Sequence, residues 1–419
     1  MKDELFNQRM DFVQSILALN DLKVNSIKPV KYDPETIFSE RLGPSTHMRP
    51  NPYSVISSQA NKAVIHPGTS PIPVGCNSVI MRLYNKDPKT GINNANRAEN
   101  EVACMSLARQ ALAGSAYSCI IPDIYTWASI SQGQGFIMMQ HMPGEVTNKA
   151  LNKMDIDDKS AVFRQMADIL ALIQKFELPK TIEAFGGLTF NDKAHATSAQ
   201  MTLRVGGPST SCRDFIRSML AGKLEEADNN SVIEGWNENK LRPSLDKYLE
   251  VGLPHILDHL KNERRVLLHS YFTTNKLLFD PDKFLGFSFS GIYGAQLPGP
   301  NSEAFDHLIR EAILNRFPES LPTFESEELK RQWKVAKAWN AKLARSGAAT
   351  PQTIPHFDRI ADIYWLEDNL SPFDLENKHL RQQNTQDELR ARREEIVQIL
   401  GEILDDEGFG SSDKTQGSR

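Results

Sequence analysis

The hydrophobic pattern of the chain changes near Pro143 and Gly144. Before this point, β-branched runs such as YSVISS, AVI and SVIMRLY alternate with Gly- and Pro-containing turns, which is typical of strands and hairpins. After it come long stretches with helical periodicity, for example KSAVFRQMADILALIQKFEL, interrupted by one β-rich stretch at 266–292. The change predicts a two-lobed α+β protein, with a small β-rich N-terminal lobe and a larger helical C-terminal lobe that carries one hairpin.

One amphipathic helix is expected among the strands of the N-terminal lobe. The stretch NNANRAENEVACMSLARQALAGS has apolar residues at three- and four-residue spacing, namely Ala98, Val102, Met105, Ala108 and Leu112. The following stretch, CIIPDIYTWASISQGQGFIMMQHMPG, predicts two further short strands. We therefore expect a sheet of five strands with a helix packed against it.

These patterns divide the chain into four segments. They are a helical lead-in and connection (1–52), the N-terminal lobe (53–142), the helical C-terminal lobe (143–407) and a disordered tail (408–419). The last helix is expected to begin with a capping box from Thr385 to Glu388. Its predicted apolar face consists of Ile396, Ile399, Leu400 and Ile403.

Composition and charge argue against several classes of partner. The 419 residues carry a net charge of -5, without the basic stripe that binding to a nucleic-acid backbone requires. No uncharged apolar run approaches the roughly 18 residues of a membrane span. The four cysteines are scattered and form no CxxC pair, so neither a zinc site nor a disulfide framework is indicated. We expect a cytoplasmic protein with a small-molecule ligand and without nucleic-acid or membrane partners; the sequence does not indicate a protein partner.

Arg82 and Glu101 are candidates for an ion pair. Glu101 lies beside the apolar face of the expected helix, and a half-buried carboxylate there needs a cationic partner. Arg82, in the strand SVIMRLY, would point toward the same space. Two unrelated surface charges would explain these residues equally well if they stood alone.

A series of further segments, taken in their order along the chain from about residue 60 to 405, indicates relatedness to known proteins. They are CNSVIMRLY, NRAENEVACMSLARQAL, IIPDIYTWA, GFIMMQHMPG, FRQMADILALIQ, FGGLTF, VIEGWNENKLRPSLDKY and VLLHSYFTTNKLLFDPD. As a series they resemble a fungal branch of the aminoglycoside phosphotransferase and choline kinase-like family.

This resemblance implies a protein-kinase-like fold that clamps a nucleotide between two lobes. The adenine would lie on the tether near Met139, Gln140 and Met142, and small hydroxylated substrates would lie on the helical lobe. Active relatives use ATP and magnesium. Arg82 and Glu101 would correspond to the strand lysine and helix glutamate of kinases, with arginine in place of lysine.

The catalytic loop departs from the family pattern. That pattern reads roughly HxDFTxxNIL, with the Asp as base and the Asn as a magnesium ligand. In HSYFTTNKLL, His269 and the FTT run match, but Tyr271 stands at the Asp position and Lys276 at the Asn position. The following strand, similar to LLDFDF in the family, reads LGFSF here, so that Gly286 and Ser288 replace its acids. His269 is expected to be a structural residue of the loop.

The substituted residues are poorly suited to magnesium-dependent chemistry. Tyr271, with an ordinary pKa of about 10, is a weak base at neutral pH. The ammonium of Lys276 repels a metal ion but attracts phosphate or carboxylate. Asp280 and Asp282 flank Pro281 in an expected β-turn, and three strand residues, roughly 10 Å, separate them from Lys276.

We therefore predict a pseudokinase, a catalytically degenerate phosphotransferase-like protein that uses neither a metal nor another cofactor. Lys276 and Arg82 are expected to face the space between the lobes without a carboxylate to balance them, and so to bind a small anionic ligand.

Two other functions remain open from the sequence. A pocket lined by His269, Tyr271, Lys276 and Ser288 could serve a secondary-metabolism enzyme of a non-phosphoryl class, acting by cyclisation, isomerisation or elimination. Alternatively, the protein is an active phosphotransferase that uses acids outside the family pattern. The sequence identifies neither the ligand nor a reaction.

Overall fold

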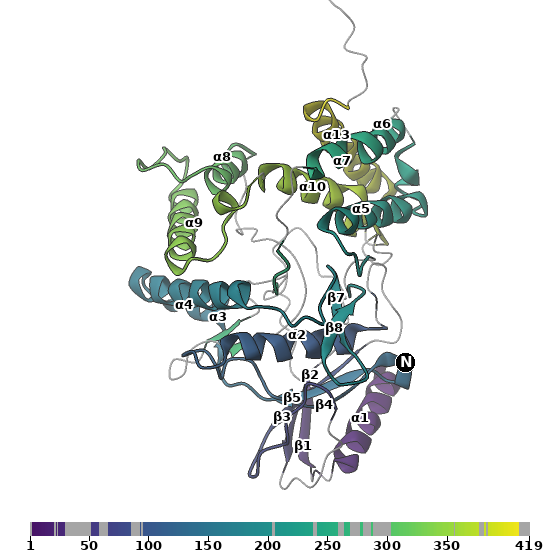
Figure 1. Ribbon diagram of the computed structural model, residues 1–419, viewed down its shortest axis with the longest axis vertical. Coiled ribbons are helices and arrows are strands. Elements are labelled where there is room, and N and C mark those ends of the chain that lie inside the picture. Colours follow the sequence, from purple (N-terminus) through teal and green to yellow (C-terminus); the bar gives the residue numbers. More distant parts are fainter. Residues whose placement is uncertain are drawn as a thin grey trace, which may run out of the picture.

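The computed structural model confirms the expected fold class, with a small sheet-bearing N-terminal lobe and a larger helical C-terminal lobe (Figure 1). It describes residues 2–20, 22, 24–29, 52–57, 66–84, 93, 95–202, 206–237, 241–258, 264–268, 277–279, 286–287, 303–355, 357–376, 381–382 and 384–409. Among these residues, no helix combines the length and apolar character that crossing a membrane requires.

The N-terminal lobe contains the first five strands and two long helices. In chain order they are α1 (Lys2–Leu19), β1 (Val24–Pro29), β2 (Pro52–Ser57), β3 (Val79–Leu83), α2 (Arg97–Leu112), β4 (Ile124–Ala128) and β5 (Phe136–Gln140). The described strands form one antiparallel sheet in the order β1-β2-β3-β5-β4.

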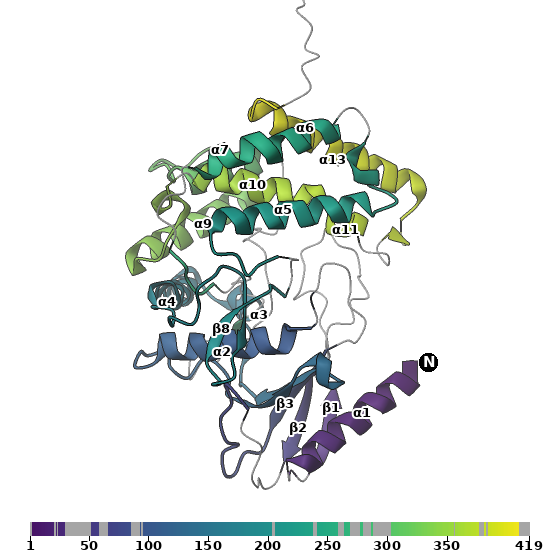
Figure 2. The same cartoon turned by 45° about the vertical axis from the view of Figure 1, so that its right-hand side comes forward.

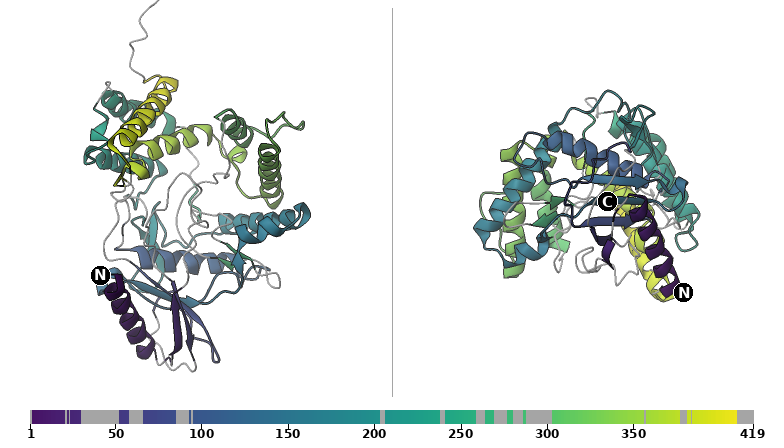
Figure 3. Two further views of the ribbon diagram at one scale, coloured as in Figure 1. Left: turned by 180° about the vertical axis from the view of Figure 1, so that it is seen from behind. Right: turned by 90° about the horizontal axis from the view of Figure 1, so that it is seen from below.

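The two faces of this sheet follow from strict alternation along β3 and β5. Val79, Met81 and Leu83 of β3 point to one face, where they pack with α1. Ile80 and Arg82 point to the other face, which α2 covers. Figures 1 and 3 show the two helices on different sides of the sheet. Alternation therefore places Arg82 on the side of the sheet that faces α2.

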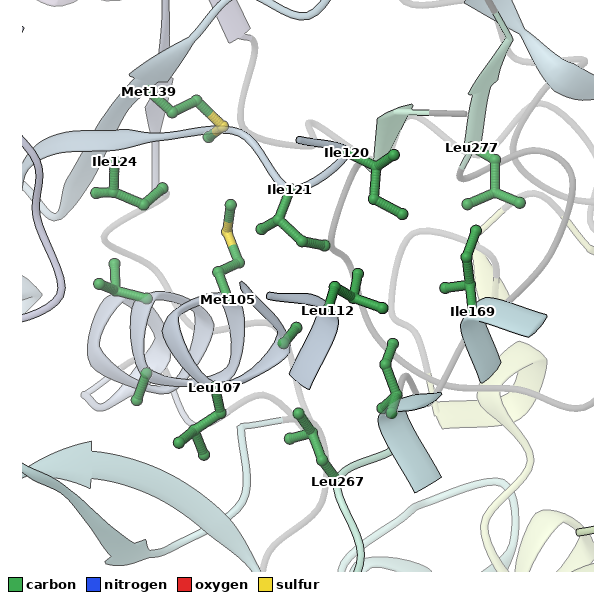
Figure 4. Packing of buried hydrophobic residues seen from close by; sticks show 14 of the residues in the cluster. Met105, Leu107, Leu112, Ile120, Ile121, Ile124, Met139, Ile169, Leu267 and Leu277 are labelled. Atoms are coloured by element: carbon green, nitrogen blue, oxygen red, sulfur yellow. The ribbon is translucent and has the colours of Figure 1, made fainter. Parts of the chain in front are cut away.

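Helix α2 forms as the sequence predicts, and all five residues of its predicted apolar face are buried. The core around it also joins the two lobes. Figure 4 shows this packing, which brings together Met105, Leu107 and Leu112 of α2 with Ile120, Ile121, Ile124, Met139, Ile169, Leu267 and Leu277. Because α4 and the segments 264–268 and 277–279 share this core, α2 is held by both lobes.

Strand β1 was not expected, because its stretch reads as a polar connection. It pairs with β2, from Val24 opposite Ser57 to Pro29 opposite Tyr53. Ile27 packs against the hydrophobic cluster between the sheet and α1. Helix α1 supplies Val13 and Leu17 to the same cluster, so the lead-in is part of the packed lobe. The stretch AVI, expected as a strand, lies outside the described residues.

The C-terminal lobe is mainly helical. Its elements are β6 (Glu145–Val146), α3 (Thr147–Lys153), α4 (Ile156–Lys175), β7 (Gly187–Phe190), β8 (Ala196–Ala199), α5 (Cys212–Asp228), α6 (Leu241–Lys247), α7 (Leu253–Leu257), β9 (Leu277–Phe279), β10 (Gly286–Phe287), α8 (Glu303–Leu314), α9 (Glu327–Ser346), α10 (Phe357–Leu370), α11 (Phe373–Glu376) and α13 (Gln386–Asp406). Helices α5, α6, α7, α10 and α13 share a core of their own, visible as a stack in Figure 2.

The end of the chain differs in detail from the prediction. Helix α13 begins with the expected Thr385–Glu388 capping box. Its buried face includes Leu404, whereas Ile399 and Ile403 are only partly buried, because α13 presents a slightly rotated face to α6 and α10. Phe409, assigned to the disordered tail, packs its ring edge-on against Tyr248 at 5.6 Å between centroids. Residues beyond Phe409 lie outside the described part.

Candidate functional site

Arg82 and Glu101 form the ion pair that the sequence predicts. Nη1 of Arg82 donates to Oε1 of Glu101, and the side chains are only 13% and 11% exposed. The pair joins β3 to α2 because Arg82 lies on the α2-facing side of the sheet and Glu101 faces it from the first half of the helix. Burial opposes the charge on Arg82, but the attraction of Glu101 and Tyr84 holds the pKa of its guanidinium above the ordinary value.

Tyr84 completes this pair in a way that the sequence analysis missed. It lies two residues after Arg82, so alternation places it on the same face, and its hydroxyl donates to Oε2 of Glu101 at 2.6 Å. Arg97, one helical turn before Glu101, lies over the Tyr84 ring at 4.9 Å from the centroid. The carboxylate of Glu101 thus has one donor on each oxygen. The i, i+2 spacing of Arg82 and Tyr84 was the sequence signal for this arrangement.

Burial also shifts the ionisation of neighbouring groups. Burial, and then the negative charge of Glu101, raise the pKa of Tyr84 well above its usual value of 10. The same two causes raise the pKa of the Cys104 thiol to about 12. Burial lowers the pKa of Arg97 below its ordinary value. At neutral pH both Tyr84 and Cys104 are therefore protonated, and neither provides a nucleophile or a base.

We predict that Tyr84→Phe costs about 1 to 2 kcal/mol of stability at pH 7, because the charged carboxylate of Glu101 loses the hydrogen bond that the Tyr84 hydroxyl donates to it. The difference from the wild-type protein should shrink as the pH rises above about 10. The pKa of Tyr84 is higher in the folded protein than in the unfolded chain, so between these two values the folded state binds more protons than the unfolded state. The stabilisation from the Tyr84 hydroxyl is therefore complete below pH 10 and is lost as the pH increases. Urea unfolding at pH 7, 9, 10 and 11 measures both effects.

The other tyrosines do not disturb this comparison. Tyr117, whose pKa burial and Asp168 raise to about 12, contributes equally to both proteins and cancels in the difference. A stability difference that stays constant from pH 7 to pH 11 would show that the Tyr84 hydroxyl ionises in the folded protein as it does in the unfolded chain.

The tether residues proposed to contact adenine have distinct positions. Met139 is a core residue, 6% exposed, in the cluster around α2. The side-chain oxygen of Gln140 accepts from the Asp123 N–H at 3.2 Å, and the backbone N–H of Gln140 donates to the Asp123 carbonyl at 2.7 Å. Met142 is half-buried. Contact of these three tether residues with an adenine remains a prediction.

The residues predicted to form the catalytic loop lie mostly outside the described part of the chain. This applies to His269, Tyr271, Lys276 and Ser288, and to the turn acids Asp280 and Asp282. Gly286 begins β10, where it pairs with Leu278, and Phe287 pairs with Leu277. Strand β9 occupies the three residues that lie between Lys276 and Asp280 in the sequence.

No group of three or more His, Cys, Asp or Glu side chains within the described ranges is placed to hold a metal ion. Because the catalytic loop is outside those ranges, the absence of a metal site remains a prediction.

One expectation about charge is wrong. Arg82 was expected to face the space between the lobes without a balancing carboxylate, but Glu101 balances it. The reason is geometric, because the strand side that points to the expected ligand space is also the side covered by α2. The prediction that Lys276 attracts an anion concerns a residue outside the described part of the chain.

Comparison with known proteins finds similar solved structures but no similar sequences. No protein-family model matches the chain, and no curated protein sequence matches it. Similar solved structures include the gentamicin-APH(2")-IIa complex, with 13% identity, 93% of this chain and 95% of that chain covered, and a TM-score of 0.44. Aminoglycoside phosphotransferase APH(4)-Ia has 11% identity, coverages of 96% and 100%, and a TM-score of 0.45. Amicoumacin kinase hAmiN, in complex with AMP-PNP, Ca2+ and Ami, has 10% identity, coverages of 99% and 98%, and a TM-score of 0.41.

Proposed function

We propose that this protein is a pseudokinase, a phosphotransferase-like protein that binds a small anionic ligand between its lobes without transferring phosphate. The buried Arg82–Glu101 pair is the observation that supports this function most directly. In kinase-type phosphotransferases the equivalent pair orients the cation that holds the nucleotide phosphates, and it needs no metal to form. The chain retains this part of the machinery.

The parts that require a metal are missing from the sequence. Tyr271, Lys276 and Gly286 occupy the positions at which the family has its base and metal ligands. Phosphoryl transfer depends on neutralising the charge of the phosphates, mainly through magnesium and its ligands. An ammonium at position 276 offers a different solution, because it neutralises an anion directly and disfavours a metal ion beside it.

We expect ATP, or another small phosphorylated molecule, to bind equally well in EDTA and in magnesium, with transfer to small alcohols at background. Calorimetry with ATP in each buffer measures the affinity, and release of ADP measures turnover. Lys276→Ala should weaken anion binding at least tenfold, since it removes the main cation. Lys153→Ala is the matched control, because Lys153 is an exposed lysine paired with Glu145.

Three outcomes would contradict this function in different ways. Magnesium-dependent phosphorylation of an alcohol, lost in the Arg82→Ala variant, would make the protein an active phosphotransferase. Conversion of an added metabolite without ATP would indicate an enzyme of a non-phosphoryl class. Unchanged affinity in Lys276→Ala would mean that Lys276 is a solvated side chain and that the ligand is not recognised by its charge.

A further inference from the structure

A two-stranded hairpin of the C-terminal lobe lies against α2. It consists of β7 and β8, which pair from Gly187 opposite Ala199 to Phe190 opposite Ala196 and form a sheet of their own. Figures 1 and 2 show it beside α2, and β7 contacts the helix directly. This hairpin is not predicted from the sequence, in which FGGLTF is only one segment of the family resemblance.

Polar contacts tie the hairpin to α2 one residue away from Glu101. The Leu188 N–H donates to Oδ1 of Asn100 at 2.6 Å, and the Asn96 side chain donates to the Gln200 carbonyl. Gly187 permits this close approach, because a Cβ there would lie 3.0 Å from Oδ1 of Asn100 and would also collide with the Gln200 carbonyl.

Apolar contacts hold the hairpin at the same place. The Phe190 ring stacks on Trp127 of β4 with centroids 6.0 Å apart and planes at 27°. Phe190 and Val102 of α2 both meet Gly68, since a Cβ on this glycine would lie 2.9 Å from each of them. Leu188 is buried in the same cluster as Val102. The hairpin is therefore packed against β4 and α2 together.

Neighbouring residues of α2 thus have partners on different sides. Successive helical residues are rotated by about 100°, so Asn100 meets the hairpin while Glu101 meets β3. Moving α2 relative to the hairpin would break the Asn100 contact and leave the buried Leu188 N–H without this acceptor.

We propose that the β7–β8 hairpin is a clamp that fixes α2 where Glu101 pairs with Arg82, with Asn100 as its positioning residue. The clamp goes beyond ligand binding, because it would hold the ion pair formed whether or not the space between the lobes is occupied. In this chain the helix position would then be set by the fold rather than by nucleotide and metal.

The test measures the coupling between Arg82 and Glu101 directly. A double-mutant cycle with Arg82→Met and Glu101→Leu gives their coupling in the wild-type background and again in Asn100→Ala. We expect the coupling in Asn100→Ala to fall below half of its wild-type value. Hydrogen exchange of the α2 amides should accelerate at least tenfold, while that of α5 amides in the other core stays unchanged.

Two further variants make the result decisive. Phe190→Leu loosens the hairpin without altering α2 and should also lower the coupling between Arg82 and Glu101. It therefore tests the clamp even if Asn100→Ala does not fold. Lys193→Ala, in the exposed turn of the hairpin, should change neither quantity. Full coupling in both Asn100→Ala and Phe190→Leu, or equal acceleration of α2 and α5, would overturn the clamp and leave the hairpin with a purely structural role.

Discussion

Removing one partner of the Arg82–Glu101 pair should destabilise the protein far more than removing both. We expect Arg82→Met or Glu101→Leu alone to cost about 2 to 3 kcal/mol, because each removes the ion-pair partner of a charge in a site with 13% or 11% exposure. The double variant should regain at least half of the loss, since an apolar pair of similar volume strands no charge. Urea unfolding of the four proteins measures the cycle.

A further cycle in a Tyr84→Phe background isolates the coupling between the two charged side chains. The Tyr84 hydroxyl donates to Glu101, so in the presence of the hydroxyl Glu101→Leu would leave a second buried group unpaired. Lys153 and Glu145 provide a matched control with a similar ion pair at 2.9 Å but 69% and 45% exposure. Their coupling should not exceed about 0.5 kcal/mol. Additive effects at Arg82 and Glu101 would show that the buried contact carries no coupling.

The second large effect concerns the altered catalytic loop. We expect the triple variant Tyr271→Asp, Lys276→Asn and Gly286→Asp to bind ATP at least tenfold more tightly with magnesium than with EDTA. It replaces a repelling ammonium with oxygen ligands, and magnesium needs only one or two protein carboxylates besides phosphates and water. Calorimetry with both buffers measures the gain, which does not require turnover to return.

The position of the second acid needs a separate variant. Gly286 and Ser288 stand at the two acid positions of the family pattern LLDFDF. A version with Ser288→Asp in place of Gly286→Asp therefore tests the second of these positions. We expect this version, too, to bind ATP more tightly with magnesium than with EDTA.

Lys276→Ala is the control for both versions, because it removes the repelling charge without adding a ligand. If both triple variants fold and bind magnesium-ATP no better than Lys276→Ala, then residues 271, 276 and 286 or 288 do not occupy the positions assigned to them. The pseudokinase function would then lose its main support from the sequence, while the buried ion pair and the clamp on α2 would stand unaffected.

Local patterns determined much of the N-terminal lobe. Alternation in VIMRL and FIMMQ specifies two-faced strands, and the spacing of apolar residues in α2 specifies the buried side of that helix. The Arg82–Glu101 pair was predictable for the same reason, since a carboxylate at the edge of a buried helical face needs a cation on the facing strand. The capping box of α13 was equally readable from adjacent residues.

Tertiary structure alone decided which segments pair across long distances. VNSIKP has too weak a pattern to read as a strand, and it becomes β1 because β2 offers an edge and α1 covers its face. FGGLTF becomes half of a clamp because α2 presents Asn100 and Val102 to it. Likewise Phe409 is ordered because Tyr248 lies beside it. A periodic pattern determines which side chains of a segment lie on its buried face. Which distant segment packs against that face is determined by burial and hydrogen bonding in the assembled core.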